Sequence, residues 1–154
     1  MKLDDLMEEF RKHVELDALP RDEDGFYYLE FDDEVRVKIF ELEESNQLII
    51  LSSLMRLSPG EASAPLMKML LAANFRWALT AGGSYGIEPL TNGIEYCLRE
   101  PMEGMNLEKL IEKLENVTAA LQTMLRELHS HFASASDEVN LTAVAPKSTD
   151  FLQA

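Results

Sequence analysis

Apolar residues recur at two different spacings along the chain, and each spacing predicts one kind of element. In three segments they fall three and four positions apart, which places them on one face of a helix. We expect these helices over residues 2–17, 64–79 and 107–132. Pro20 and the polar residues after it end the first helix, because proline cannot continue the helical hydrogen bonding. Asn106 is suited to cap the third helix.

The segments between these helices alternate between apolar and polar residues, as half-buried strands do. The expected strands are Phe26–Phe31, Val35–Phe40, Leu48–Leu54, Ser84–Glu88 and Ile94–Arg99. Short polar turns join the first three strands, which predicts an antiparallel meander. Asn92-Gly93 lies between the last two strands and is a strong signal for a hairpin.

The predicted order is α-β-β-β-α-β-β-α, which indicates the α+β class. We expect a twisted, mostly antiparallel five-stranded sheet packed with three helices. This domain takes residues 1–133. Residues 134–154 are small, polar and without periodicity, so we expect a disordered C-terminal tail.

The second predicted helix is apolar nearly all round, with only Lys68, Asn74 and Arg76 as polar interruptions after its first turn. A helix of this kind is buried on all sides. A small domain offers few places for such burial, which favours a subunit interface over an ordinary core position.

Composition narrows the possible functions. The chain has 154 residues, with 28 acidic and 14 basic side chains and a net charge of −14. This charge argues against binding to nucleic acid or to anionic membranes. The single cysteine excludes an internal disulfide and suits a reducing compartment. With no signal-like or membrane-spanning apolar run, the sequence predicts a soluble cytoplasmic protein.

Half of the excess acid lies in residues 21–44, which hold ten acidic and three basic residues. Two interpretations remain open. The acids form solvated turns and faces, or they keep an adhesive surface soluble and steer a basic partner.

Few residues suggest catalysis. His13 stands alone, and His129 and His131 lie two apart on a predicted helix, so they point in different directions and cannot chelate one metal. Cys97 has no nearby base and is interpreted as a buried structural thiol.

The segment Gly82–Gly86 resembles a phosphate loop only weakly, because it leads from a helix into a strand and lacks the Lys-Ser/Thr ending. Asp32-Asp33 lies in a predicted turn. We therefore expect no enzyme activity, no metal and no cofactor.

The first strand carries more aromatic surface than one sheet face needs. Phe26 and Tyr28 face one way, whereas Tyr27, Leu29 and Phe31 face the other. Either the N-terminal helix covers the second set, or that set and the strand edge accept a strand from another chain. A helix at the rim of the sheet would allow both. Eight methionines, whose side chains adapt to varied partners, fit a binding role.

Several short motifs agree in spacing with one family. They are Leu70-Leu71-Ala72-Ala73-Asn74-Phe75, Gly82-Gly83, Tyr85-Gly86-Ile87-Glu88-Pro89, Asn92-Gly93-Ile94 and Leu98-Arg99-Glu100-Pro101-Met102-Glu103-Gly104-Met105. Together they resemble the bacterial type III secretion effector chaperones of class I, the Tir chaperone type. Met102 and Met105 stand where leucine is usual in that family.

This resemblance implies a non-enzymatic homodimer in the bacterial cytoplasm. Such a protein binds the N-terminal segment of one or more secreted effectors and holds it for the secretion ATPase. The implied partner surface comprises Leu3, Leu6, Phe10, Tyr27, Leu29 and Phe31. The implied dimer surface comprises Leu70, Phe75, Trp77, Ile94, Tyr96 and Leu98.

Two alternative functions remain. A regulator of the same fold would sequester a secretion-linked partner and control expression of the secretion system. A small enzyme or ligand-binding domain is the third possibility, and only the glycine-rich turn supports it.

Overall fold

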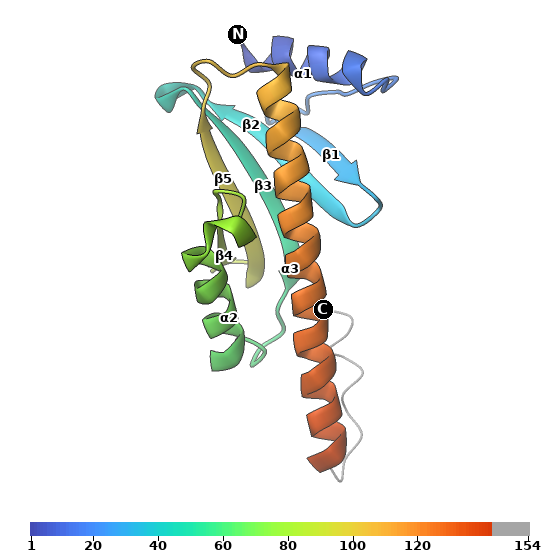
Figure 1. Cartoon of the computed structure of the whole chain (residues 1–154), viewed down its shortest axis with the longest axis vertical. Coiled ribbons are helices and arrows are strands. Elements are labelled where there is room, and N and C mark those ends of the chain that lie inside the picture. The colour runs from blue at the N-terminus through green and yellow to red at the C-terminus, as the bar shows by residue number, and fades with distance from the viewer. Residues whose placement is uncertain (143–154) are drawn as a thin grey trace.

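The computed structural model describes residues 1–142 (Figure 1), and it describes side-chain surroundings up to Ala133, Ala78 excepted. The helices are α1 (Leu3–His13), α2 (Ala64–Phe75) and α3 (Leu107–Thr142), with short 3₁₀ turns η1 (Glu43–Ser45) and η2 (Trp77–Leu79). The strands are β1 (Tyr27–Phe31), β2 (Val35–Leu42), β3 (Gln47–Arg56), β4 (Ser84–Glu88) and β5 (Gly93–Pro101).

The five strands form one sheet in the order β1-β2-β3-β5-β4, and every neighbouring pair is antiparallel. The predicted α+β fold is confirmed, and so is the Asn92-Gly93 hairpin, in which Asn92 adopts a left-handed conformation with φ of 56°. In Figure 1, α3 crosses one face of the sheet and extends beyond it, while α1 lies at the end where α3 begins. α2 packs beside the edge strand β4.

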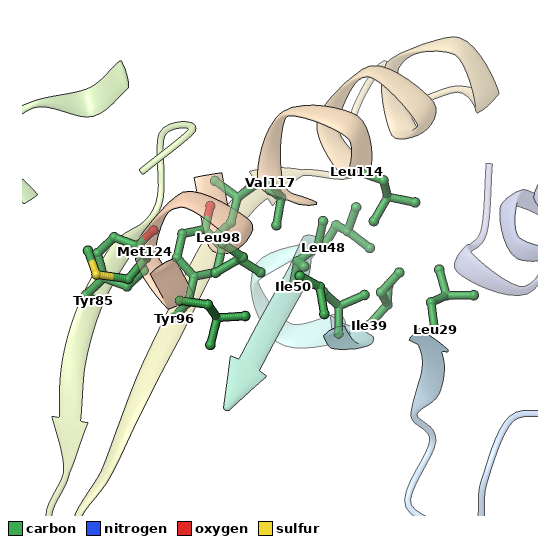
Figure 2. Close-up of a cluster of buried hydrophobic side chains, with 14 of the residues drawn as sticks. Leu29, Ile39, Leu48, Ile50, Tyr85, Tyr96, Leu98, Leu114, Val117 and Met124 are labelled. Atoms are coloured by element: carbon green, nitrogen blue, oxygen red, sulfur yellow. The ribbon is translucent and has the colours of Figure 1, made fainter. Parts of the chain in front are cut away.

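The core lies between α3 and the sheet. Ile39, Ile50 and Leu98 stand opposite one another on three adjacent strands and are almost fully buried. Figure 2 shows Leu114 and Val117 of α3 lying over this row of side chains. We call this covered side the inner face of the sheet. Strand alternation therefore leaves every second residue on an outer face that α1, α2 and α3 do not cover.

The helices begin where the sequence predicts, but their ends differ. α1 stops at His13, and Glu15 is left-handed with φ of 56°. α2 stops at Phe75, because Arg76 is extended and the chain then tightens into η2. Side chains cap the N-termini of α2 and α3. The Ser63 hydroxyl accepts from the Leu66 N–H at the start of α2, and the Asn106 side chain accepts from the Lys109 N–H at 3.0 Å at the start of α3.

α3 is longer than the expected 107–132, since it continues to Thr142. The expected tail at 134–154 therefore needs correction over its first nine residues, which are helical. The physical reason is that Ala and Ser do not stop a helix already nucleated on a packed face. Residues 143–154 lie outside the described part of the chain.

The structure decides which face of β1 is covered. The Tyr27 hydroxyl donates to the Asp4 carboxylate at 2.8 Å, and Arg21 pairs with the same carboxylate at 3.0 Å. These contacts hold α1 against β1, and its apolar face joins the core. The side of β1 that carries Tyr27 and Leu29 is therefore the covered one, and Tyr28 is exposed.

Candidate partner-binding and dimer surfaces

A groove of about 1160 Å³ runs over the outer face of the sheet, and residues of all five strands line it. One cross-strand row forms its floor: Tyr28, Lys38, Leu51, Cys97 and Ser84. Most of this row is apolar or aromatic, and Tyr28 is 55% exposed. We call this surface the outer groove. It is wide enough, and apolar enough, to take a segment of another polypeptide.

Several charged side chains along the outer groove have partners within the chain, and the Lys38 ammonium lies 4.2 Å from the centre of the Phe26 ring. Arg36 forms an ion pair with Glu30 at 2.8 Å, and Glu95 accepts from the Ser53 hydroxyl at 2.7 Å. The Glu88 carboxylate accepts from the Leu90 N–H at 3.1 Å and from the Thr91 N–H at 2.6 Å, and these bonds, the one from Leu90 first, lower the pKa of its carboxyl. The outer groove thus has apolar and aromatic side chains in its floor and charged side chains that already have partners within the chain, which suits an apolar segment better than a charged ligand.

A second apolar surface lies on α2 and η2. Leu71, Phe75, Trp77 and Leu79 are 69%, 87%, 79% and 39% exposed. We call these four residues the α2 patch. The other side of α2, with Leu66 and Leu70, is buried in the core. The exposed apolar side of α2 could therefore pack against another surface, as expected for a subunit contact.

Two buried tyrosines hold the backbone that presents the α2 patch. The Tyr96 hydroxyl donates to the Thr80 carbonyl at 2.6 Å, and the Tyr85 hydroxyl donates to the Leu79 carbonyl at 3.1 Å. Burial raises the pKa of Tyr85 to about 12, and it also raises the pKa of Tyr96. A side chain at Gly83 would come within 2.5 Å of the Tyr96 ring, so this close approach requires glycine.

The six predicted partner residues come together, but inside the protomer. Leu3, Leu6, Phe10, Tyr27 and Leu29 are all buried, and Phe31 is half-buried. They form the contact between α1 and the sheet, so the alternative in which the N-terminal helix covers this face is the one that the structure shows. Their role in partner binding stays a prediction, which would require α1 to move. The exposed aromatic of the strand is Tyr28.

The predicted dimer residues divide into two groups. Phe75 and Trp77 are exposed, whereas Leu70, Ile94, Tyr96 and Leu98 are buried. In β5, Ile94, Tyr96 and Leu98 lie on the inner face, whereas Glu95, Cys97 and Arg99 lie on the outer face. The role of all six residues in a dimer interface stays a prediction. Sequence reasoning missed Leu71, Leu79 and Leu51. An apolar helix gives no signal of which side faces water, so only the packing of α2 could identify the first two.

The residues examined for chemistry stay apart. Cys97 is half-buried on the outer groove, which corrects its expected burial. In the part of the chain that the structure describes, no three His, Cys, Asp or Glu side chains gather as a metal site would require. The Asp32-Asp33 pair forms a turn in which both residues have φ of 54°. Among residues 1–142, no helix has the length and apolar character needed to span a membrane.

Comparison with solved structures finds the same fold in chains of several protein complexes. A chain of the ExsC-ExsE complex has a TM-score of 0.66 and 23% identity, covering 82% of this chain and 96% of its own. A chain of the HopA1-SchA chaperone-effector complex has a TM-score of 0.62 and 18% identity, covering 80% and 90%. A chain of the ExoU-SpcU complex from Pseudomonas aeruginosa has a TM-score of 0.59 and 12% identity, covering 77% and 93%. No curated protein matches the sequence.

The family comparison agrees with the fold and with the motif spacing. The model of the Tir chaperone protein (CesT) family matches residues 5–125, which include every strand, α2, most of α1 and the first half of α3. The matched segment therefore contains the outer groove and the α2 patch. The chain belongs to the Tir chaperone protein (CesT) family.

Proposed function

We propose that this protein is a non-enzymatic chaperone that binds the N-terminal segment of one or more type III secreted effectors in the bacterial cytoplasm. It keeps that segment soluble and hands it to the export apparatus, including the secretion ATPase. The observation that carries the proposal is the outer groove on a chain of this family, because α1, α2 and α3 leave that face of the sheet open.

The neighbouring structures support a polypeptide as the ligand. HopA1-SchA is a chaperone-effector complex, and ExoU-SpcU is a heterodimeric complex of the type III secretion system. In the present chain, β1 is an edge strand that adjoins the groove. An extended segment could add to that edge through backbone hydrogen bonds while its side chains enter the groove.

The α2 patch supports the second part of the proposal, a homodimer. Exposed Phe75 and Trp77 side chains are costly in a free monomer, and aromatic residues are enriched at the centres of interfaces. Two copies related by a two-fold axis would bury both patches at once. The effector would then bind to a dimer with two outer grooves.

A regulator of the same fold is the second candidate, and the likeness to the ExsC-ExsE complex favours keeping it. It would use the same groove to sequester a secretion-linked partner. Gene deletion separates the two. Loss of a chaperone removes one or a few effectors from the secreted fraction, whereas loss of a regulator changes expression of the whole secretion system.

Mass spectrometry of proteins that co-purify with the tagged chain tests the proposal. We expect a secreted protein, and we expect Leu51→Glu to abolish its capture while the dimer remains. Val14→Glu is the matched control, since Val14 is exposed at the end of α1 and away from the groove. Capture of no exported protein would contradict the proposed function, and full capture by Leu51→Glu would exclude the outer groove.

A further inference from the structure

An open sheet has two edges, and here they are β1 and β4. An edge strand presents backbone N–H and C=O groups to solvent at every second residue, and these groups can pair with another chain. A protein that binds extended segments at one sheet edge needs that edge to be exposed. Its other edge must be blocked, because an exposed strand there would pair nonspecifically with other chains. The two edges of this sheet differ in their backbone hydrogen bonds.

On β4, a side chain occupies the place of a neighbouring strand. The Tyr85 N–H donates to Asn74 Oδ1 at 2.7 Å, and Asn74 Nδ2 donates to the Tyr85 C=O at 2.9 Å. In an antiparallel sheet, two residues that exchange both bonds in this way form a hydrogen-bonded pair. A carboxamide carries the same donor and acceptor as a peptide group. Asn74 therefore imitates one residue of a sixth strand.

The remaining outward positions of β4 are few. Outward-facing residues alternate, so Gly83 and Ile87 are the neighbours of Tyr85 along this edge. The Gly83 N–H donates to the Thr80 carbonyl at 2.9 Å. Two residues beyond Ile87, the next outward position is Pro89, which has no N–H to donate. Ile87 is left as one isolated position, which is too short for a stable strand pair.

The β1 edge has no such closure. Within the described residues, Tyr27 to Glu30 make no backbone hydrogen bond outside the pairing with β2. α2 is positioned to close β4 because its Ser63 cap and buried Leu66, Leu70 and Ala73 fix it beside that strand.

We propose that Asn74 is a strand mimic that closes the β4 edge and leaves β1 as the open edge of the sheet. Asn74 is thus a specificity-determining residue: it prevents a second copy of this chain from pairing edge to edge through β4. The consequence that an effector segment adds at β1 rests on the proposed function, but the closure of β4 does not.

The test compares self-association of the full chain with and without the mimic. Asn74→Leu keeps a side chain of similar size and removes both hydrogen bonds. We expect species larger than the wild-type assembly in sedimentation velocity, and at least about tenfold faster hydrogen exchange of the Tyr85 amide. Unchanged assembly and unchanged exchange would overturn the proposal.

A second pair of variants separates edge pairing from loss of stability. Ile87→Pro, added to Asn74→Leu, removes the outward N–H that a pairing strand needs, and proline is tolerated at that side of an edge strand. Ile87→Ala, added in the same way, removes the packing but keeps the N–H. We expect only the proline to restore the wild-type assembly. Equal suppression by alanine, or none by proline, would show that the self-association comes from another surface. Neither measurement needs an effector, so the outcome is independent of the proposed function.

Discussion

One step along β1 moves a side chain from solvent to the core. Tyr28 is 55% exposed on the outer groove, whereas Leu29 is 8% exposed beneath α1. The two residues are neighbours in the same strand, so local backbone stability affects both equally. Their difference is a direct measure of which face the fold buries.

We therefore predict that Leu29→Asp and Tyr28→Asp differ sharply in stability. Leu29→Asp places a carboxylate in the apolar core and should lower the free energy of unfolding by about 3 kcal/mol or more. Tyr28→Asp should cost about 1 kcal/mol or less, because its carboxylate remains in water. Urea unfolding of both variants makes the comparison. Equal losses would contradict the assignment of faces.

The buried tyrosines give the molecule a pH dependence at alkaline values. Tyr85 has a pKa of about 12 when folded, because burial disfavours the phenolate, and an ordinary pKa near 10 when unfolded. The stabilisation is fully present below pH 10, since neither state is ionised there. It is lost as the pH rises from about 10 to about 12, because only the unfolded chain then releases the proton.

Stability measured by urea unfolding should accordingly fall between about pH 10 and about pH 12, and Tyr85→Phe should make that fall shallower. Tyr28→Phe is the control. Its hydroxyl is exposed, and a hydrogen bond to Asp22 rather than burial is the first cause that raises its pKa. If both variants follow the wild-type curve, ionisation of Tyr85 does not limit alkaline stability.

At the scale of elements, the Asp4 carboxylate forms the polar contacts between α1 and β1. Asp4 accepts from the Tyr27 hydroxyl and pairs with Arg21, and the latter also donates to the Gly25 carbonyl at 3.0 Å. The link therefore joins the first turn of α1, the loop before β1 and β1 itself. Its charged part is largely exposed, so it contributes modestly to stability.

We expect Asp4→Ala to lower the free energy of unfolding by about 1 kcal/mol and to speed proteolysis in the segment between α1 and β1. Asp5→Ala is the matched control, because Asp5 lies in the same first turn and has the same favourable position at the helix N-terminus. Limited proteolysis followed by mass spectrometry locates the cuts. Identical digestion of the two variants would show that Asp4 does not hold α1.

At the scale of the whole molecule, apolar and acidic surfaces are kept apart. The excess acid of residues 21–44 lies mainly in turns, at Asp22–Asp24, Asp32–Glu34 and Glu43–Glu44, which flank β1 and β2. This arrangement agrees with the interpretation of solvated turns, and it places negative charge at both ends of β1 and β2. Such charge keeps a chain with exposed apolar surface soluble.

The proposed dimer gives the prediction that belongs to this scale. Phe75→Ser combined with Trp77→Ser should convert the dimer to a monomer in sedimentation equilibrium. The circular dichroism spectrum should be unchanged, because both side chains are exposed in the protomer. Leu90→Ser is the control, since Leu90 is 94% exposed but lies in the β4–β5 turn, outside the α2 patch. A dimeric double variant would exclude the α2 patch as the interface.

The sequence by itself determined the order of elements, the α+β class and the family, because periodicity, turn residues and short motifs are local properties. Asn92-Gly93 predicted its hairpin and Asn106 its cap, since each acts on the backbone within a few residues of itself.

Only the tertiary structure decided which faces are open. Alternation showed that Tyr27 and Leu29 share a side of β1, but the docking of α1 buries that side. In β5, the two-residue period does not specify whether Tyr96 faces inward or outward. The position of α3 over one face of the sheet makes that face, with Tyr96, the buried one. Asn74 is an interruption in an apolar helix by sequence, and it becomes a strand mimic only because α2 packs beside β4. The spacing of apolar residues predicts which residues share one face of a helix or strand. Whether that face is exposed depends on contacts between segments that are distant along the chain.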